Sequence, residues 1–439
     1  MLNTPPVSPR RVISNLRWWI AAVLFASTVI NYLDRQTLSL LSPFLKVQYH
    51  WSNTDYASIV IAFRISYTIG QTLLGKLMDK LGTRRGLTLT VLWYSLVSVL
   101  TPVAKGLASF RVFRFLLGAG ESANWPAATK AVSEWFPGKD RGLATAFFDS
   151  GSSVGGVIAS AIVVPIYLRW GWRVAVIIPG LLGFFWILLW RKVYQPPQAH
   201  PLISDEEREL LALDQADLAN KDPGLRPSWR GLLKLPQTWG TIIARTFTDP
   251  VWFFVADWFP IYLGTKGVDW SSGFLAAAVP FIAADLGNFS GGIASGWLIR
   301  RGWSLGAARK TVVVFGSIGV MFLIPTIFTT TLWMITLLFA FATFSYAAFS
   351  TMANVLPSDL YESGSVASVS GFGGTGAGIG TIIASALVGH YSDVRHGMAT
   401  HAFDPILIIA GLIPFVGMLL VLLLVRNTKA TRDGLVRPI

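Results

Sequence analysis

Long apolar segments recur along almost the whole chain and limit what it can fold into. A helix needs about 20 mainly apolar residues to cross a bilayer, and runs of this length alternate here with polar loops. We expect spans near 18–42, 56–77, 86–105, 109–132, 142–167, 172–193, 237–264, 274–299, 311–330, 332–353, 364–391 and 404–426. The sequence therefore predicts an all-α membrane protein of about twelve transmembrane helices.

Composition agrees with this class and excludes several others. Of the 439 residues, 53% are hydrophobic and 13% are charged, against about 25% charged in soluble domains. The absence of cysteine excludes disulfides, thiol nucleophiles and cysteine–metal sites. The five histidines form no compact cluster with acidic neighbours, so no metal site is expected. The net charge of +13 is typical of Lys and Arg kept on the cytoplasmic side, and we expect no nucleic-acid partner.

One polar stretch divides the spans into two sets of six. We expect an N-terminal half at 1–194, a cytoplasmic central loop at 195–235 and a C-terminal half at 236–439. Residues 204–210 (SDEEREL) predict a short helix in that loop, capped by Ser204 with acids in its first turn. Paired halves are typical of secondary transporters, whose substrate site lies between them near the midplane.

The charge of the loops predicts the topology. An even number of spans places both termini on one side, and most Lys and Arg fall in the loops of that side. The positive-inside rule then puts both termini and the central loop in the cytoplasm. The first apolar run has no small-residue cleavage site, so we expect no removable signal peptide.

A loop motif occurs in both halves. Residues 75–85 (GKLMDKLGTRR) follow the second expected span, and residues 296–302 (GWLIRRG) follow the eighth, 221 positions later. In the first copy, Gly75 permits close helix approach and Asp79 can cap a helix or pair with a cation. The second copy carries Arg300 where the acid would stand.

These motifs resemble known families. The first loop is similar to the signature loop of the major facilitator superfamily. Residues 31–39 (NYLDRQTLS) resemble the first-helix motif of the anion:cation symporter family, which includes bacterial sugar-acid/proton symporters. Other similar segments are Arg114 to Glu121 (RFLLGAGE), 133–137 (SEWFP) and, as in the hexuronate branch, 151–155 (GSSVG), Arg245 with 249–252 (DPVW) and 284–287 (ADLG).

The resemblance implies a proton-coupled importer of a hexuronate-like sugar acid, working by alternating access in a bacterial inner membrane. Both termini would be cytoplasmic, the protein would be a monomer in the lipid bilayer, and the proton gradient would replace any cofactor. The substrate would be a small organic anion. The resemblance assigns substrate binding to Arg35, Tyr67, Arg114, Ser152 and Arg245, proton coupling to Asp34 and Glu121, and a conformational switch to Gly75, Asp79, Gly82, Arg84 and Arg85.

Charge inside a span costs at least about 2.5–3.5 kcal/mol on insertion scales, so such residues usually have a partner or a pathway. Arg114 and Glu121 are seven apart and face the same way on a helix. An arginine fork suits a substrate carboxylate. Competition between Glu121 and substrate for Arg114 would couple the movement of the proton to that of the substrate. The alternative for the pair is a structural ion pair between helices.

Other buried charges have structural alternatives as well. Asp34 and Arg35 are adjacent and point in different directions, and Asp34 could instead only lock helix packing. Arg64, which has no counterpart in the family pattern, shares a face with Tyr67 and is added as a substrate-binding candidate. Arg245 could instead reach the headgroups.

Two motif matches are set aside. Residues 151–155 fit the esterase Gly-x-Ser-x-Gly pattern, but no strand precedes them and they lie in an apolar span. Residues 371–378 (GFGGTGAG) look like a phosphate cradle but lack the following Lys-Ser/Thr. Small residues in a membrane helix instead predict close approach of a neighbour. We therefore expect no catalytic residues and no enzyme.

Three alternatives remain open from the sequence. The substrate could be another organic anion, namely an aldonate, an aldarate or an aromatic acid, and Arg64 would favour a dianion. A drug/proton antiporter is less favoured because the fifth span lacks a Gly-x-x-x-Gly-Pro-type motif. A membrane enzyme would need a catalytic cluster at headgroup depth, and the sequence has none.

Overall fold

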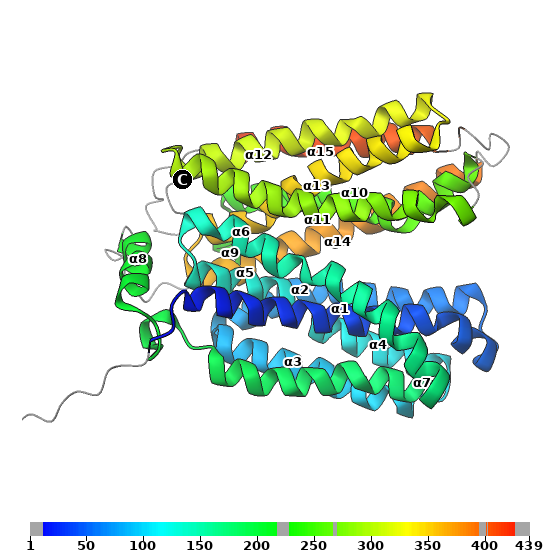
Figure 1. The fold of residues 1–439 in the computed structure, drawn as a ribbon, viewed down its shortest axis with the longest axis horizontal. Coiled ribbons are helices and arrows are strands. Elements are labelled where there is room, and N and C mark those ends of the chain that lie inside the picture. The colour runs from blue at the N-terminus through cyan, green and yellow to red at the C-terminus, as the bar shows by residue number, and fades with distance from the viewer. Residues whose placement is uncertain (1–11, 217–227, 267–269, 395–400, 402, 426–439) are drawn as a thin grey trace, which may run out of the picture.

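The chain folds into long helices that lie roughly along one axis (Figure 1). The computed structural model describes residues 12–216, 228–266, 270–394, 401 and 403–425. The helices of the first half are α1 (Leu16–Tyr49), α2 (Asn53–Leu81), α3 (Thr83–Leu100) with the 3-10 turn η1 (Thr101–Val103), α4 (Leu107–Glu121), α5 (Asn124–Trp135), α6 (Gly138–Asp149) and α7 (Gly151–Val193).

Two expected boundaries in this half differ from the structure. The fourth expected span is broken at Ser122 and Ala123 into α4 and α5. The fifth begins as α6 and continues into α7, which also contains the sixth. Gly171 separates these two spans, because its backbone (φ 80°, ψ 169°) is not helical and favours glycine.

The second half repeats the pattern after a central segment. That segment contains the 3-10 turn η2 (Pro197–Ala199), α8 (Asp205–Ala216) and α9 (Trp229–Leu233). The helices that follow are α10 (Pro236–Thr265), α11 (Trp270–Arg300), α12 (Leu305–Val320) with η3 (Met321–Phe328), α13 (Leu332–Leu360), α14 (Ser363–Val394) and α15 (Asp404–Leu424).

The expected twelve-helix membrane class is confirmed. Each expected span corresponds to one of these helices or to a broken or kinked pair. Among the described residues, eight helices are long and apolar enough to cross a membrane, the combined α6–α7 segment counting as one. The other spans are the interrupted α4–α5 pair and α10 and α11.

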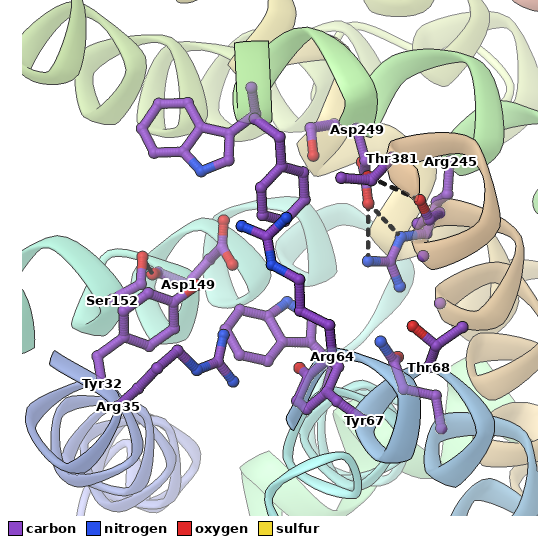
Figure 2. A pocket seen from close by; sticks show the side chains of 18 of the residues that line it. Tyr32, Arg35, Arg64, Tyr67, Thr68, Asp149, Ser152, Arg245, Asp249 and Thr381 are labelled. Carbon is purple, nitrogen blue, oxygen red and sulfur yellow. Dashed lines mark hydrogen bonds and ion pairs between the residues drawn. The ribbon is translucent and has the colours of Figure 1, made fainter. Parts of the chain in front are cut away.

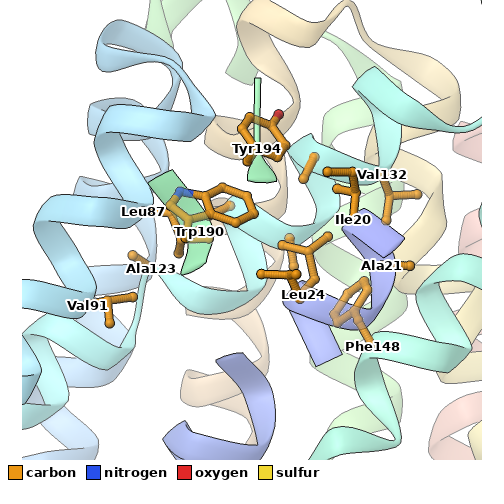
Figure 3. Packing of buried hydrophobic residues seen from close by; sticks show 14 of the residues in the cluster. Ile20, Ala21, Leu24, Leu87, Val91, Ala123, Val132, Phe148, Trp190 and Tyr194 are labelled. Carbon is orange, nitrogen blue, oxygen red and sulfur yellow. The ribbon is translucent and has the colours of Figure 1, made fainter. Parts of the chain in front are cut away.

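The two sets of spans form two bundles in Figure 1, with α1, α3, α4 and α7 below, α10, α12, α13 and α15 above, and α5, α6, α11 and α14 in the middle where the bundles meet. Their buried apolar cores are also separate. The core of the first bundle joins Ile20, Leu24, Phe148 and Trp190 from three helices (Figure 3), and in the described part of the chain only Ala367 reaches it from the other half. Each bundle therefore has its own apolar core, which allows it to move as one unit.

The start of the central segment is attached to the first bundle. Ser204 caps α8 by accepting a hydrogen bond from the Glu207 amide at 3.1 Å, as the sequence predicted. Glu207 in turn accepts the Leu16 and Arg17 amides, each at 3.1 Å, at the N-terminus of α1. Leu211 adds its side chain to the first core. α8 thus belongs physically to the N-terminal bundle.

The bundles meet tightly at the end where α8 lies (Figure 1). Asp79 pairs with Lys130 at 3.0 Å and accepts the Ser368 amide of α14 at 2.7 Å. Lys130 also donates to the Ser363 carbonyl at 2.6 Å. Because α14 belongs to the other bundle, these bonds hold the two halves together at this end.

A second corner of the same end is built around Asp359 of α13. Its carboxylate pairs with Arg309 of its own half at 2.8 Å and with Arg141 of the other half at 3.2 Å. Arg309 also donates to the Gly138 carbonyl at 2.7 Å. The loop copy of the second half has Arg300 in place of an acid. In that half, Asp359 of α13 provides the carboxylate that binds the other bundle.

Glycines allow α2 and α14 to approach each other at this end. A Cβ on Gly75 would lie 2.4 Å from the Ala367 carbonyl oxygen, and one on Gly371 would lie 2.2 Å from the Gln71 carbonyl oxygen. The glycine-rich run at 371–378 therefore serves close helix packing, as expected.

Gly75→Ala tests this packing. We expect a loss of stability of about 1–3 kcal/mol, because the added methyl meets backbone that cannot yield easily. Gly364→Ala is the matched control on α14, since a Cβ there has nothing within 4 Å. Thermal unfolding of both purified variants, followed by tryptophan fluorescence, gives the comparison. Equal midpoints would show that the α2–α14 contact is not tight.

Candidate functional site

A polar cavity of about 340 Å³ lies between the two bundles. Its lining comes from both halves, and Figure 2 shows side chains entering it from several helices. All six residues that the sequence analysis assigned to substrate binding line it: Arg35, Arg64, Tyr67, Arg114, Ser152 and Arg245. The six candidates thus lie around one cavity, and their role in substrate binding remains a prediction.

Arg35 is a cation of the cavity wall with both an acidic and aromatic partners. Its Nη2 and Nε atoms donate to Glu121 Oε2 at 3.2 and 3.4 Å. The guanidinium lies 4.7 Å from the centre of the Tyr67 ring and 4.8 Å from that of Tyr32. Aromatic faces attract a cation that has left water, so Arg35 is held in place while 25% of its side chain stays exposed.

Glu121 differs from Arg35 because it is sealed from the cavity. Its side chain is fully buried, and its Oε1 atom has no hydrogen-bond partner among the described residues. A ligand can therefore reach Arg35 but not Glu121. The sequence analysis expected Glu121 and substrate to compete for Arg114, but in the structure Glu121 pairs with Arg35.

Arg114, on α4, lies next to Arg35 of α1. Its Nη2 atom donates to the Arg35 carbonyl at 3.3 Å, and its guanidinium lies 5.9 Å from the centre of the Phe63 ring. It also interacts electrostatically with Asp34 and Glu121. Arg114 thus adds positive charge beside Arg35 without a close ion pair of its own among the contacts described.

Asp34 lies outside the cavity lining. It is buried at 3% exposure and accepts a hydrogen bond from Ser98 of α3. As expected from their adjacency, Asp34 points into its own bundle while Arg35 points to the cavity. A role for Asp34 in contact with substrate is therefore excluded in this conformation, whereas a role in holding a proton remains a prediction.

Arg64 and Tyr67 share a face of α2, as predicted. Tyr67 stacks on Phe63 with ring centres 5.6 Å apart. Arg64 reaches across the cavity, and its guanidinium lies 5.7 Å from the centre of the Phe253 ring on α10. Figure 2 shows Arg64 between the two halves of the site.

Arg245 pairs with Asp249 one turn along α10. Its Nη2 and Nε atoms donate to Asp249 Oδ2 at 2.9 and 3.2 Å. Arg245 Nη1 and Asp249 Oδ1 are buried without a hydrogen-bond partner among the described residues. Unsatisfied buried polar atoms are uncommon in native structures, and these two lie at a cavity wall.

The sequence analysis missed a polar contact between the halves beside Ser152. Asn288 of α11 donates to Asp149 at 3.3 Å, and Ser153 donates to Asp285 of α11 at 2.8 Å. Ser152 itself donates to the Asp149 carbonyl at 2.8 Å. Asp285 thus joins α7 and α11 while it lines the cavity. The in-span charge of Asp149 was the available signal.

Aromatic residues of the cavity were missed too. Trp125, Trp252 and Tyr346 line it, with Trp252 stacked on Tyr346 at a ring-centre distance of 6.1 Å. Nothing in the sequence distinguishes these rings from the many others in apolar spans.

Comparison with known proteins identifies the family. The Major Facilitator Superfamily profile matches residues 24–385. The chain belongs to the major facilitator superfamily. This superfamily consists of membrane transporters, so the protein is a transporter-type integral membrane protein and not an enzyme, in agreement with the sequence analysis.

Curated relatives lie within the expected branch of the superfamily. The "Hexuronate transporter" of Escherichia coli (strain K12) is 29% identical over 427 residues, covering 96% of each chain. The "Galacturonate transporter" of Dickeya chrysanthemi is 32% identical over 309 residues, covering 70% of this chain and 89% of the relative. The "Probable galactarate/D-glucarate transporter GarP" of E. coli K12 is 28% identical over 429 residues, covering 94% and 95%.

Solved structures confirm the fold. A proton:xylose symporter bound to 6-bromo-6-deoxy-D-glucose superposes with a TM-score of 0.70 at 14% identity, covering 92% of this chain and 95% of that one. The human organic anion transporter MFSD10 gives 0.66 at 12% identity, covering 95% and 100%. At these identities the similarity concerns the fold alone.

The superfamily loop motif has a defined geometry here. Gly82 ends α2 with φ 77°, a conformation that favours glycine. Arg84 donates to the Arg191 carbonyl at 2.5 Å, and Arg85 is exposed. With Gly75 and Asp79 in contact with α14, the loop touches both halves, and its role as a switch remains a prediction.

The absence of native cysteine permits a direct test of the cavity. Ser152→Cys should react with a small polar thiol reagent at least about ten times faster than Ser317→Cys, because thiol reactivity requires access. Ser317 is fully buried on α12 and is not among the lining residues. Mass spectrometry of detergent-purified protein gives the labelled fractions. Equal rates would contradict the cavity.

Proposed function

We propose that the protein is a proton-coupled symporter that imports a sugar-acid anion, a hexuronate such as galacturonate or glucuronate. The observation that carries this proposal is the Arg35–Glu121 pair, with its arginine in the cavity and its acid sealed behind it. The relatives named for hexuronate and galacturonate support the substrate class.

The mechanism follows from the need to neutralise buried charge. A substrate carboxylate fits the Arg35 fork, but Glu121 occupies the fork in the empty site. Protonation of Glu121 removes its charge and frees Arg35, which the substrate carboxylate then neutralises. Proton and anion therefore favour each other's binding, as symport requires.

The remaining assigned residues complete this proposal. Arg114 adds positive charge behind Arg35, and Asp34 offers a second proton-binding carboxyl that Ser98 orients. Tyr67 and Ser152 supply hydroxyls toward the sugar chain. Arg64 and Arg245 extend the site across the cavity.

Alternating access would use the division into two bundles. We propose that both termini face the cytoplasm of a bacterial inner membrane, so that the tightly bonded end near α8 is the cytoplasmic end. The structure then represents an outward-facing state of a monomer. Rocking the bundles would break the bonds of Asp79 and Arg141 to the other half and release substrate and proton inward.

Uptake by proteoliposomes tests the anion site. Labelled galacturonate and glucuronate should accumulate under an inward proton gradient, and Arg114→Ala should reduce uptake by at least about a hundredfold, because the anion site loses a desolvated positive charge. Arg230→Ala, an exposed cytoplasmic-segment change, serves as the control. Undiminished uptake by Arg114→Ala would contradict the site.

Proton coupling has a separate test. Glu121→Gln keeps the shape of the acid but cannot bind and release a proton, so Arg35 should stay available to substrate. We expect substrate exchange without a gradient to persist, while gradient-driven accumulation falls to the equilibrium level. Accumulation that survives in Glu121→Gln would show that another group carries the proton.

A further inference from the structure

The charges lining the cavity are not evenly distributed. The arginines of the first half, Arg35, Arg64 and Arg114, lie on α1, α2 and α4. Two aspartates, Asp249 and Asp285, lie on α10 and α11 of the other half, and Asp149 is hydrogen-bonded to Asn288 of α11. We call Asp149, Asp249 and Asp285 the acidic side of the cavity.

The acidic side has more carboxyls than cations in the described residues. Arg245 is the cation hydrogen-bonded to it, through two bonds to Asp249 Oδ2. The hydrogen-bond partner of Asp285 is the Ser153 hydroxyl, and that of Asp149 is the Asn288 amide. Both partners are neutral, so Arg245 is the one cation among the hydrogen-bond donors described for these three carboxyls.

Asp249 also has a buried acceptor atom that lacks a partner in the described part of the chain. Its side chain is 10% exposed, and Oδ1 has no hydrogen-bond partner among the described residues. Carboxylate oxygens accept hydrogen bonds and donate none when ionised. A sugar hydroxyl would donate to this oxygen, whereas a second carboxylate would donate nothing to it.

We propose that the acidic side binds the hydroxyl chain of the substrate and rejects a second carboxylate, so that the site selects sugar monoacids over sugar diacids. This inference rests on the proposed function. A diacid is doubly ionised at pH 7. Its second carboxylate would face either repulsion from the acidic side or the need to protonate one of its carboxyls.

Galacturonate and galactarate form a matched pair for the test, because they differ at one end, where galactarate carries a second carboxylate. In competition with labelled galacturonate uptake by proteoliposomes, galactarate should inhibit the wild type at least about tenfold more weakly than unlabelled galacturonate, a difference of about 1.4 kcal/mol. Galactarate inhibition as strong as that of galacturonate would overturn the proposal.

Asp249→Asn should shift this preference in a defined direction. The change removes a negative charge and leaves Arg245 without its internal carboxylate, so a second substrate carboxylate can take its place. We expect the ratio of inhibition constants to move about tenfold towards galactarate. The double variant Asp249→Asn/Arg245→Gln should lose this gain, because the freed arginine is absent. An unchanged ratio in Asp249→Asn, or a gain that persists in the double variant, would overturn the proposal.

Asp285→Asn keeps the test decisive if Asp249→Asn fails to fold. It removes one charge without freeing an arginine, so the ratio should move in the same direction by about threefold. No movement would count against the proposal.

Thermal shift of the purified protein with each ligand separates the two proposals. Absence of transport with a retained binding preference for galacturonate would overturn symport and leave the selectivity standing. Accumulation of both acids to the same extent would support symport and overturn the selectivity. Failure of both acids to bind would overturn both.

Discussion

A cation held at the edge of a membrane cavity needs a counter-charge, and the Arg35–Glu121 pair meets this need. Removing an ion from water costs several kcal/mol unless a partner compensates it. Arg35 pairs with an acid on its sealed side, keeps 25% of its side chain exposed and has aromatic rings beside it. In the mechanism that we propose, the site exchanges this internal carboxylate for that of the substrate while the arginine stays neutralised. Arg114, Asp34 and Tyr67 all lie next to this pair. Arg114 donates to the Arg35 carbonyl, Asp34 precedes Arg35 in the chain, and the Tyr67 ring lies beside the Arg35 guanidinium.

The second arginine of the cavity is bound differently. Arg245 and Asp249 lie on one helix, so their separation does not change when helices move past each other. Arg35 and Glu121 come from α1 and α4, so a shift between those helices alters their contact. The first half thus holds a pair that can respond to motion within its bundle, and the second half holds a pair with fixed geometry. That contrast supports a coupling role in the first half and a recognition role in the second.

The twelve-helix class could be predicted because span length and apolar composition are local properties of the sequence. The cavity-facing arginines could be predicted because charge inside a span rarely lacks a reason. The pairing of Glu121 with Arg35 could not, since periodicity on one helix says nothing of which neighbour lies beside it. The same limit applies to Asp149 and Asn288, whose contact joins helices from different halves. The break at Gly171 falls between the expected spans 142–167 and 172–193, so it could be predicted from the spacing of the apolar runs.

The bonded end near α8 has a consequence for how the protein responds to salt. Among the described contacts there, only Arg141 and Asp359 form an ion pair between halves, whereas Asp79, Lys130 and Arg309 reach across to backbone amides and carbonyls. Such buried charge–dipole contacts are screened far less than exposed charge pairs. The bonds that join the two bundles at this end should therefore change little with ionic strength.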